Sequence, residues 1–271
     1  MSPSLYIPPA HYKHHMDITL RDRFIDRWQN VCPGAELPIT FEISDDSSAA
    51  ERAKPKKDWH CIICDLARVR HGKSLVFDRS SVGCSGGLFY LGYDTHRNEH
   101  FRYFLSTGKT GVVEGERYKK SPEIVDESDA HHKTLPLPGK YYTFKRWDAL
   151  TEADNPNVVI FFARPEVLSC LFTLANFDQA EPDGVIAPFG SGCSSIIHYP
   201  RLEEKSAHPR AVLGMFDPSA RPCVPLDVLT FALPMKRFAT LVGNMDESFL
   251  VTPTWNAVKG KIKESTALHS R

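Results

Sequence analysis

The chain has 271 residues, of which 42% are hydrophobic and 24% charged, a composition that allows a large buried core and argues against extensive disorder. Lysine plus arginine equals aspartate plus glutamate at 33 each, so the chain lacks the basic excess typical of nucleic-acid binders. No stretch approaches the roughly 20 apolar residues that span a bilayer, and the N-terminus lacks the apolar core of a secretory signal, so we expect a cytoplasmic protein.

The N-terminal part alternates between helical and strand-like patterns. Residues 1–19 are expected to form an irregular arm that precedes the folded domain. The segment 21–31 has apolar residues at helical spacing and predicts an amphipathic helix, whereas 37–46 alternates in the manner of a strand. A buried helix at 59–72 and a strand at 73–78 follow.

The middle of the chain contains the clearest strand. Residues 99–128 predict two helical pieces around a glycine loop, and the proline-rich segment 135–140 is the candidate for an internal boundary. A strand is expected at 141–150. The segment 157–163 is apolar throughout, which predicts a central strand covered on both faces. Pro165 is placed to open the next helix, over 165–178.

The C-terminal part continues this alternation. Its segments are a glycine turn leading into a short helix at 187–200, apolar stretches at 211–217 and 229–234, a helix at 235–245 and a last helix after Thr252. Strands that alternate with helices favour an α/β fold, a mixed β-sheet with helices packed on it. We expect a single compact domain over 20–271, with two sub-lobes if 135–140 is a true boundary.

Two familiar motifs are incomplete in this chain. Gly108-Lys109-Thr110 resembles the end of a phosphate-binding loop, but Tyr103 stands where that motif requires glycine. Cys61 and Cys64 are separated from the pair His96 and His100 by 31 residues, far more than the roughly 12–15 of a zinc finger. Neither nucleotide binding nor a zinc finger is therefore expected.

Three of the seven cysteines lie in similar local surroundings. Cys84, Cys193 and Cys223 are each flanked by small or conformationally restricted residues. Exposed backbone N–H groups in such turns would lower a thiol pKa and favour the thiolate, which is both nucleophile and metal ligand. The residues expected to form this cradle are Gly83, Ser85, Gly190, Gly192 and Ser194.

Soft thiolates select zinc, Cu(I) or iron–sulfur clusters. Three protein thiolates on a 4Fe-4S cluster would leave one iron open to substrate, so a set of three suggests catalysis more than electron transfer. The alternative is that each cysteine is a small core residue, which we expect for Cys170 and Cys32. Cys61 and Cys64 form a C-x-x-C pair that could add a ligand, form a redox pair or line the core.

Several segments are similar to one protein family. The stretches are LSTGKTGVVEGERYKKSPEIV (105–125), VVIFFARPEVLSCLFTLANFD (158–178), VIAPFGSGCSSIIHYP (185–200), AVLGMFDPSARPCVPLDVLTFALP (211–234) and CSGGLFYLG (84–92). Over about 59–255 the chain resembles the domain of unknown function 169 family of bacteria and archaea, many of them anaerobes. The resemblance implies one family domain with a site built from these segments. It implies no reaction, and it does not place CIIC (61–64).

Polar residues in the same segments are candidates for chemistry. Lys109 and Glu116, with their neighbours Glu114 and Arg117, could bind an anionic substrate or transfer protons. His198 follows Cys193 by five residues and could act as a base in the same pocket. Arg221 could hold a carboxylate or phosphate, or lower the pKa of Cys223. For each, a structural ion pair is the alternative.

The sequence thus predicts an oxygen-sensitive iron–sulfur protein, an enzyme of redox or lyase type that acts on a small molecule. Its cluster ligands would be Cys84, Cys193 and Cys223. The alternatives are a non-catalytic metal or cofactor module, such as a carrier or sensor, and a cofactor-free enzyme with Cys193 or Cys223 as nucleophile. No nucleic-acid or membrane partner is expected, and the oligomeric state is left open.

Overall fold

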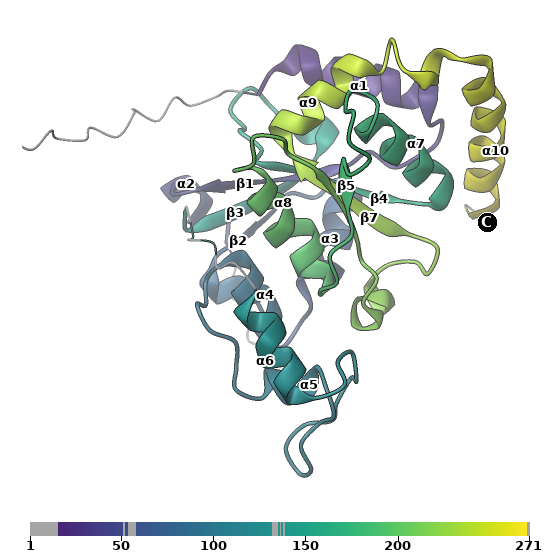
Figure 1. Ribbon diagram of the computed structural model, residues 1–271. Coiled ribbons are helices and arrows are strands. Elements are labelled where there is room, and N and C mark those ends of the chain that lie inside the picture. The colour runs from purple at the N-terminus through teal and green to yellow at the C-terminus, as the bar shows by residue number, and fades with distance from the viewer. Residues whose placement is uncertain are drawn as a thin grey trace, which may run out of the picture.

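The fold is built on one mixed β-sheet. The computed structural model describes residues 16–269 except 51, 54–57, 132–134, 136 and 138, so the predicted arm at 1–19 lies largely outside the described residues. Within them the strand order is β2-β3-β1-β4-β7-β6-β5 (Figure 1). The strands are β1 Ile39–Ser44, β2 Leu75–Phe77, β3 Tyr141–Arg146, β4 Val158–Ala163, β5 Val185–Ile186, β6 Ala211–Gly214 and β7 Leu229–Pro234.

Strand β4 is the centre of the sheet, as its apolar sequence predicts. All six of its residues are buried, and it pairs antiparallel with both β1 and β7. Alternate side chains enter opposite cores. Val159, Phe161 and Ala163 pack on one face, whereas Val158, Ile160 and Phe162 pack on the other. A strand covered on both faces needs apolar residues at every position, and this requirement explains the unbroken hydrophobic run.

The sheet is continuous across the predicted internal boundary at 135–140. Strand β3 follows that segment, yet it lies between β2 and β1, which both precede it. The strand pairs are antiparallel except for β5 and β6, which are parallel. The α/β class with a mixed sheet is therefore confirmed.

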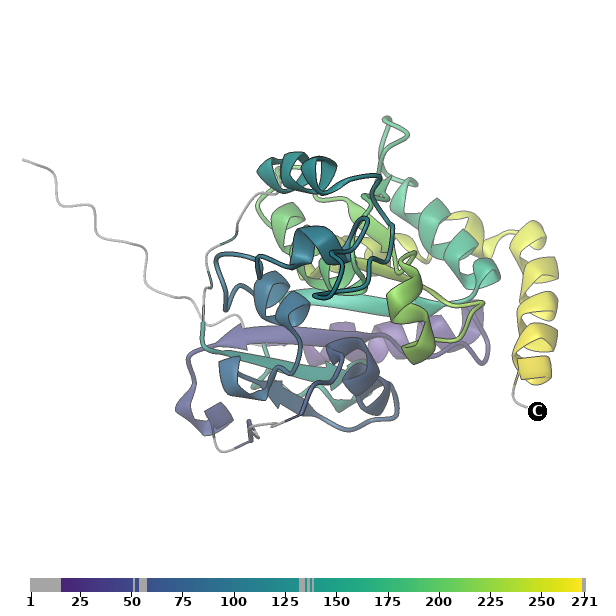
Figure 2. The ribbon, with the colours of Figure 1, turned by 90° about the horizontal axis from the view of Figure 1, so that it is seen from below.

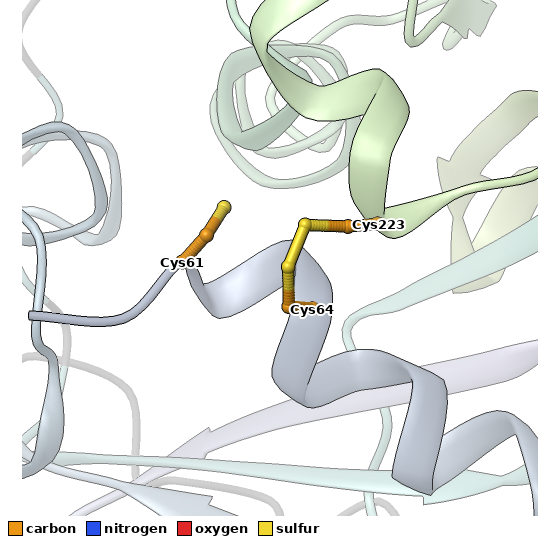
Figure 3. A group of neighbouring side chains, drawn as sticks. All are labelled: Cys61, Cys64 and Cys223. Carbon is orange, nitrogen blue, oxygen red and sulfur yellow. A yellow bond between two sulfur atoms is a disulfide. The ribbon is translucent and has the colours of Figure 1, made fainter.

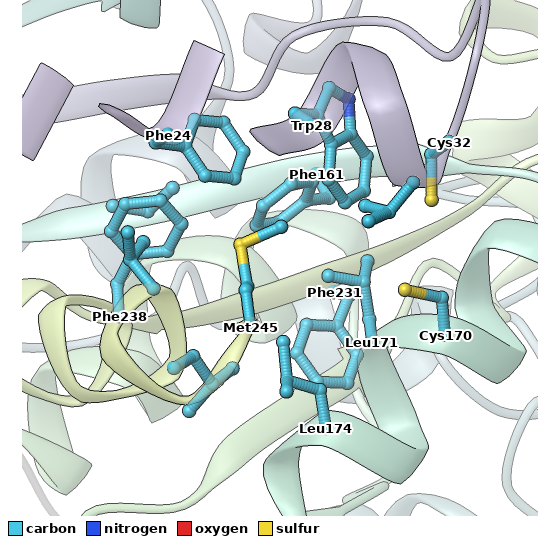
Figure 4. Close-up of a cluster of buried hydrophobic side chains, with 14 of the residues drawn as sticks. Phe24, Trp28, Cys32, Phe161, Cys170, Leu171, Leu174, Phe231, Phe238 and Met245 are labelled. Atoms are coloured by element: carbon cyan, nitrogen blue, oxygen red, sulfur yellow. The ribbon is translucent and has the colours of Figure 1, made fainter. Parts of the chain in front are cut away.

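In the described part of the chain, four helices cover one face of the sheet. They are α1 Ile18–Val31, α7 Pro165–Ala175, α9 Met235–Asn244 and α10 Pro253–His269. Phe24 and Trp28 of α1 pack with Phe161 and Phe238 beneath them (Figure 4). Cys32 and Cys170 are fully buried in this cluster, as predicted for core residues. The helices predicted at 21–31, 165–178 and 235–245 are those seen here.

The opposite face carries the segments in which the sequence placed its site. Its helices are α3 Ile62–Arg70, α4 Ser85–Leu91, a π-helical turn Ser194–His198, α8 Tyr199–Glu203, α5 Phe101–Phe104 and α6 Pro122–Ala130 (Figure 2). The predicted pair of helical pieces within 99–128 is α5 and α6. A short helix, α2 Ser47–Ala50, follows β1. Among the described helices none combines the length and apolarity needed to cross a bilayer.

Candidate functional site

A cavity of about 1400 Å³ opens on the α3 and α4 face. Its walls come from the first turns of α3 and α4 and from the loop before the π-helical turn. Asp217, the 3-10 helix Pro218–Cys223 and the segment that carries α5 and α6 complete them. Typical ligand pockets enclose about 300–1,000 Å³, so this space is large enough for a small molecule beside a bound metal centre.

Three cysteine sulfur atoms meet at the first turn of α3. Cys61 caps the helix with extended backbone, and Cys64 lies one turn further. Cys223, 159 residues later, is joined to Cys64 by a disulfide, and the three sulfur atoms lie within 4.8 Å of one another (Figure 3). Cys61 keeps a free thiol and lines the cavity, whereas Cys64 is exposed to solvent.

Two further cysteines lie on the cavity wall. Cys84 caps α4, and its sulfur accepts a hydrogen bond from the Gly87 N–H at 3.3 Å. Cys193 follows the Gly190-Ser191-Gly192 loop and is 6% exposed. The thiols of Cys61 and Cys84 are both close enough to raise the pKa of Cys193. The fold therefore brings Cys61, Cys84 and Cys193, from three distant segments, to the wall of one cavity.

Burial controls the acidity of two of these thiols. It is the main cause of the raised pKa of Cys193 and of Cys61, and the backbone N–H groups of Ile63 and Cys64 only partly oppose it at Cys61. The sequence-based expectation that glycine-rich turns lower these pKa values is therefore wrong for Cys193, because desolvation outweighs the N–H donors. A raised pKa lowers the fraction of each thiol that is ionised at neutral pH, and a cation that replaces the proton favours the thiolate form.

Asp217 is a buried carboxyl group on the same wall. It is 4% exposed, and burial raises its pKa, while the Gly192 N–H and the Ser219 hydroxyl oppose the shift. Ser219 donates to Oδ2 at 3.1 Å. Oδ1 is shielded from solvent and, within the described part of the chain, has no partner with hydrogen-bond geometry. The sequence pattern around Asp217 gave no sign that this carboxyl group is buried.

Only some of the glycine and serine residues predicted to cradle the cluster line the cavity. Ser85, Gly190 and Gly192 line it, whereas Gly83 and Ser194 do not. Gly83 lies against the His60 ring, which a Cβ would approach to 2.1 Å. Ser194 is buried and donates from Oγ to the Ser191 carbonyl at 2.7 Å. These two residues serve packing and local hydrogen bonding, which the sequence pattern could not distinguish from ligand contact.

His198 and Glu116 line the cavity, as their candidate roles require. His198 is 3% exposed and lies edge-on to Tyr90 and Tyr199. Glu116 is exposed, and its Oε2 accepts a hydrogen bond from the Tyr118 hydroxyl at 3.4 Å. Their roles in catalysis stay predictions.

Lys109 is exposed and is not among the residues that line the cavity. Its Nζ lies 5.1 Å from the centre of the Tyr103 ring. Lys109 forms an isolated bridge with Val113 in the glycine loop. Lys109 therefore belongs to that loop and not to the cavity lining.

Arg221 braces a loop instead of facing the cavity. Its guanidinium donates to the carbonyl oxygens of Met215, Val228 and Pro225 at 3.2, 2.7 and 2.8 Å. Met215 has a φ of 70°, a conformation unfavourable for a non-glycine residue, so these bonds hold a strained turn. Three of its N–H donors are thus used on backbone carbonyls. That Arg221 binds a carboxylate or phosphate stays a prediction.

Aromatic and cationic residues that the sequence did not single out surround the opening. Trp59 and Phe189 both line the cavity, although 77% and 54% of their surface is exposed. Arg97 is held against the Phe101 ring at 4.8 Å and pairs with Asp129. No spacing in the sequence marks these residues, since the segments that carry them meet only in the folded chain.

Comparison with known proteins gives one match. The model of the family DUF169, described as "Uncharacterised ArCR", matches residues 36–244. The match starts before the resemblance seen in the sequence and ends slightly earlier, and it includes Cys61 and Cys64. None of the curated proteins and none of the solved structures matches the chain.

Proposed function

Because the chain belongs to the DUF169 family, whose description names no activity, we propose its function from the site itself: a thiolate-bound metal centre beside a small-molecule cavity. The ligands are Cys61, Cys64 and Cys223 in their reduced state. The favoured form is an iron–sulfur cluster, since three protein thiolates leave one iron free to bind a substrate.

The observation that carries the proposal is the convergence of three sulfur atoms within 4.8 Å. A metal must replace the protons of all three thiols, so the Cys64–Cys223 disulfide has to accept two electrons and two protons first. Cys61 lines the cavity, so a metal held by the three sulfurs would lie at the cavity wall. This placement supports a role in chemistry on a bound small molecule.

Cys84 and Cys193, which the sequence proposed together with Cys223, border the same cavity. They are the alternative ligands, and their thiols are close enough to Cys61 to influence its charge or that of a bound metal. The neighbouring groups available for proton transfer are His198, Glu116 and Asp217. An enzyme of redox or lyase type is the function that this combination supports best.

A cofactor-free enzyme that uses Cys193 as nucleophile has less support. Burial raises the pKa of that thiol, so little of it is thiolate at neutral pH. A non-catalytic carrier or sensor needs the metal centre but not the cavity. Turnover of a small molecule by the metal-loaded protein would separate the enzyme from the carrier.

The proposal is tested by anaerobic reconstitution of the reduced protein with iron and sulfide. The expected product is brown, absorbs near about 400 nm and holds about four irons per chain. Cys61→Ser, Cys64→Ser and Cys223→Ser should each lose most of the metal. Cys170→Ala, a buried cysteine on the opposite face of the sheet, is the matched control and should retain it.

The variants also identify the ligand set. Metal loss in Cys84→Ser and Cys193→Ser, but not in Cys61→Ser, would move the centre to the ligands proposed from the sequence. Stoichiometric zinc without iron would support the thiolate centre and reject the cluster. A folded, fully reduced protein that binds neither metal would refute the proposal.

A further inference from the structure

The three cysteines at α3 also form a reactive arrangement that needs no metal. One of them, Cys61, is a free thiol, and the other two form a disulfide. The Cys61 sulfur lies within 4.8 Å of both disulfide sulfurs. Thiol–disulfide exchange requires a thiol next to a disulfide that it can attack, and this is the arrangement present.

We propose that Cys61, Cys64 and Cys223 form an intramolecular thiol–disulfide relay. Cys61 loses its proton to solvent and its thiolate attacks Sγ of Cys64. A Cys61–Cys64 bond forms, the Cys64–Cys223 bond breaks, and Cys223 leaves as a thiolate that takes up a proton. One disulfide and one thiol are present before and after, so the exchange needs no external oxidant or reductant.

Cys64 lies close to both of its possible partners, since the three sulfur atoms are within 4.8 Å of one another. Cys61 and Cys64 are three positions apart at the start of a nine-residue helix, where side chains at this spacing lie on the same face. Cys61 has extended backbone, with φ −85° and ψ 128°, so its side chain is not held in a helical turn. Cys64 already bonds to Cys223 across a Cα separation of 4.7 Å. Cys64 is thus the shared member of both pairs (Figure 3).

The two disulfides differ in which thiol they leave free. With Cys64–Cys223 closed, the Cys61 thiol lines the cavity and can react with a bound molecule. With Cys61–Cys64 closed, that thiol is consumed and Cys223 is released. Because Cys64 is exposed, a low-molecular-weight thiol can reduce either disulfide from solvent. The relay therefore links the exposed Cys64 sulfur to the Cys61 sulfur on the cavity wall.

This activity goes beyond the proposed metal centre and is independent of it. Either disulfide prevents metal binding, since both consume proposed ligands, so the relay operates in the metal-free oxidised protein. A protein that fails to bind metal can still exchange its disulfides. A protein that binds metal can likewise be incapable of exchange, so the two proposals fail separately.

The test maps disulfides in the full-length, metal-free oxidised protein. The protein is incubated with a chelator, quenched with acid at intervals, alkylated in denaturant and digested with trypsin. Residues 58–68 form one tryptic peptide that contains both Cys61 and Cys64. Mass spectrometry distinguishes this peptide closed on itself from the same peptide linked to the one that contains Cys223.

The expected result is that the linked peptide dominates at first and the closed peptide then appears with first-order kinetics. Cys61→Ser should show only the linked form, with at least about a tenfold drop in Cys223 release, because the attacking thiol is gone. Cys170→Ala removes a buried thiol on the opposite face of the sheet and should behave as the wild type. Cys223→Ser has no disulfide to exchange, and after oxidation of its two remaining thiols by dissolved oxygen it should hold only the closed peptide. Absence of the closed peptide from the wild type at every time would overturn the relay.

Discussion

At the scale of single residues, the site is governed by close packing around the sulfur atoms. Gly86 and Gly87 are neighbours in the first turn of α4, and both line the cavity. A Cβ at Gly86 would meet nothing within 4 Å. A Cβ at Gly87 would lie 2.9 Å from Cγ1 of Val82 and 3.0 Å from Sγ of Cys84. The second glycine is therefore required for the position of a cavity thiol, whereas the first is not.

This pair gives a matched prediction. Gly86→Ala should raise the free energy of unfolding by up to about 1 kcal/mol, because alanine favours the helix and has room. Gly87→Ala should lower it by about 1–3 kcal/mol, since the new methyl group displaces Val82 or Cys84. Urea unfolding measures both, and the alkylation rate of Cys84 should change only in Gly87→Ala. Equal effects of the two substitutions would contradict the packing argument.

At the scale of elements, one ion pair joins the end of α7 to α9. Arg237 is 6% exposed and donates to both carboxylate oxygens of Asp178, at 2.8 and 2.6 Å, and to the Ala175 carbonyl at 2.8 Å. This hydrogen bonding lowers the pKa of Asp178. The pair fixes two of the helices that cover one face of the sheet.

Asp178→Asn should lower the free energy of unfolding by about 2–3 kcal/mol at neutral pH, because it leaves a nearly buried guanidinium without its counter-charge. Since the folded-state pKa of Asp178 is lowered, the stabilisation is fully present above the unfolded pKa of about 3.9 and is lost as pH falls through the folded value. Urea unfolding at about pH 7 and at about pH 2–3 measures the effect. The difference in the free energy of unfolding between variant and wild type should be smaller at the acid pH.

Asp246→Asn is the control for this pair. Asp246 also binds arginines, but its side chain is 44% exposed and its partners Arg23 and Arg27 are exposed as well. Solvent screens such pairs, so the loss should be much smaller than for Asp178→Asn. If the loss of unfolding free energy in Asp178→Asn does not change with pH, the substitution acts through packing instead of charge.

At the scale of the whole molecule, the sulfur cluster ties together two parts of the chain that are 159 residues apart. The Cys64–Cys223 disulfide links α3, which packs on the sheet, to the loop that Arg221 braces. A link across so long a segment restricts the unfolded chain strongly. Metal binding at the same three sulfurs would impose a similar restraint on the reduced chain.

Reduction of the metal-free protein should therefore lower the free energy of unfolding by about 2–4 kcal/mol. Addition of the metal to the reduced protein should restore the loss, by an amount that grows with the logarithm of one plus the ratio of its concentration to its Kd. Thermal unfolding of the oxidised, reduced and reduced metal-loaded forms measures this series. Cys64→Ser should begin at the lower stability and respond to neither reductant nor metal.

The sequence by itself determined the elements and the class of the fold. Helical spacing predicted α1, and Pro165 marked the start of α7. The apolar run at 157–163 predicted the central strand β4, because a strand buried on both faces has apolar residues at every position. It also separated Cys32 and Cys170 from the other cysteines, since both lie in apolar helical surroundings.

Only the tertiary structure decided which residues share the site. The chain pattern at Arg221 and Ser194 is compatible with ligand contact, yet their donors bind backbone carbonyls. The pairing of Cys64 with Cys223 and the burial of Asp217 depend on loops that meet across the sheet. Local patterns report burial and backbone preference, whereas distances between sulfur atoms far apart in the chain are set by how the helices and loops pack on the sheet.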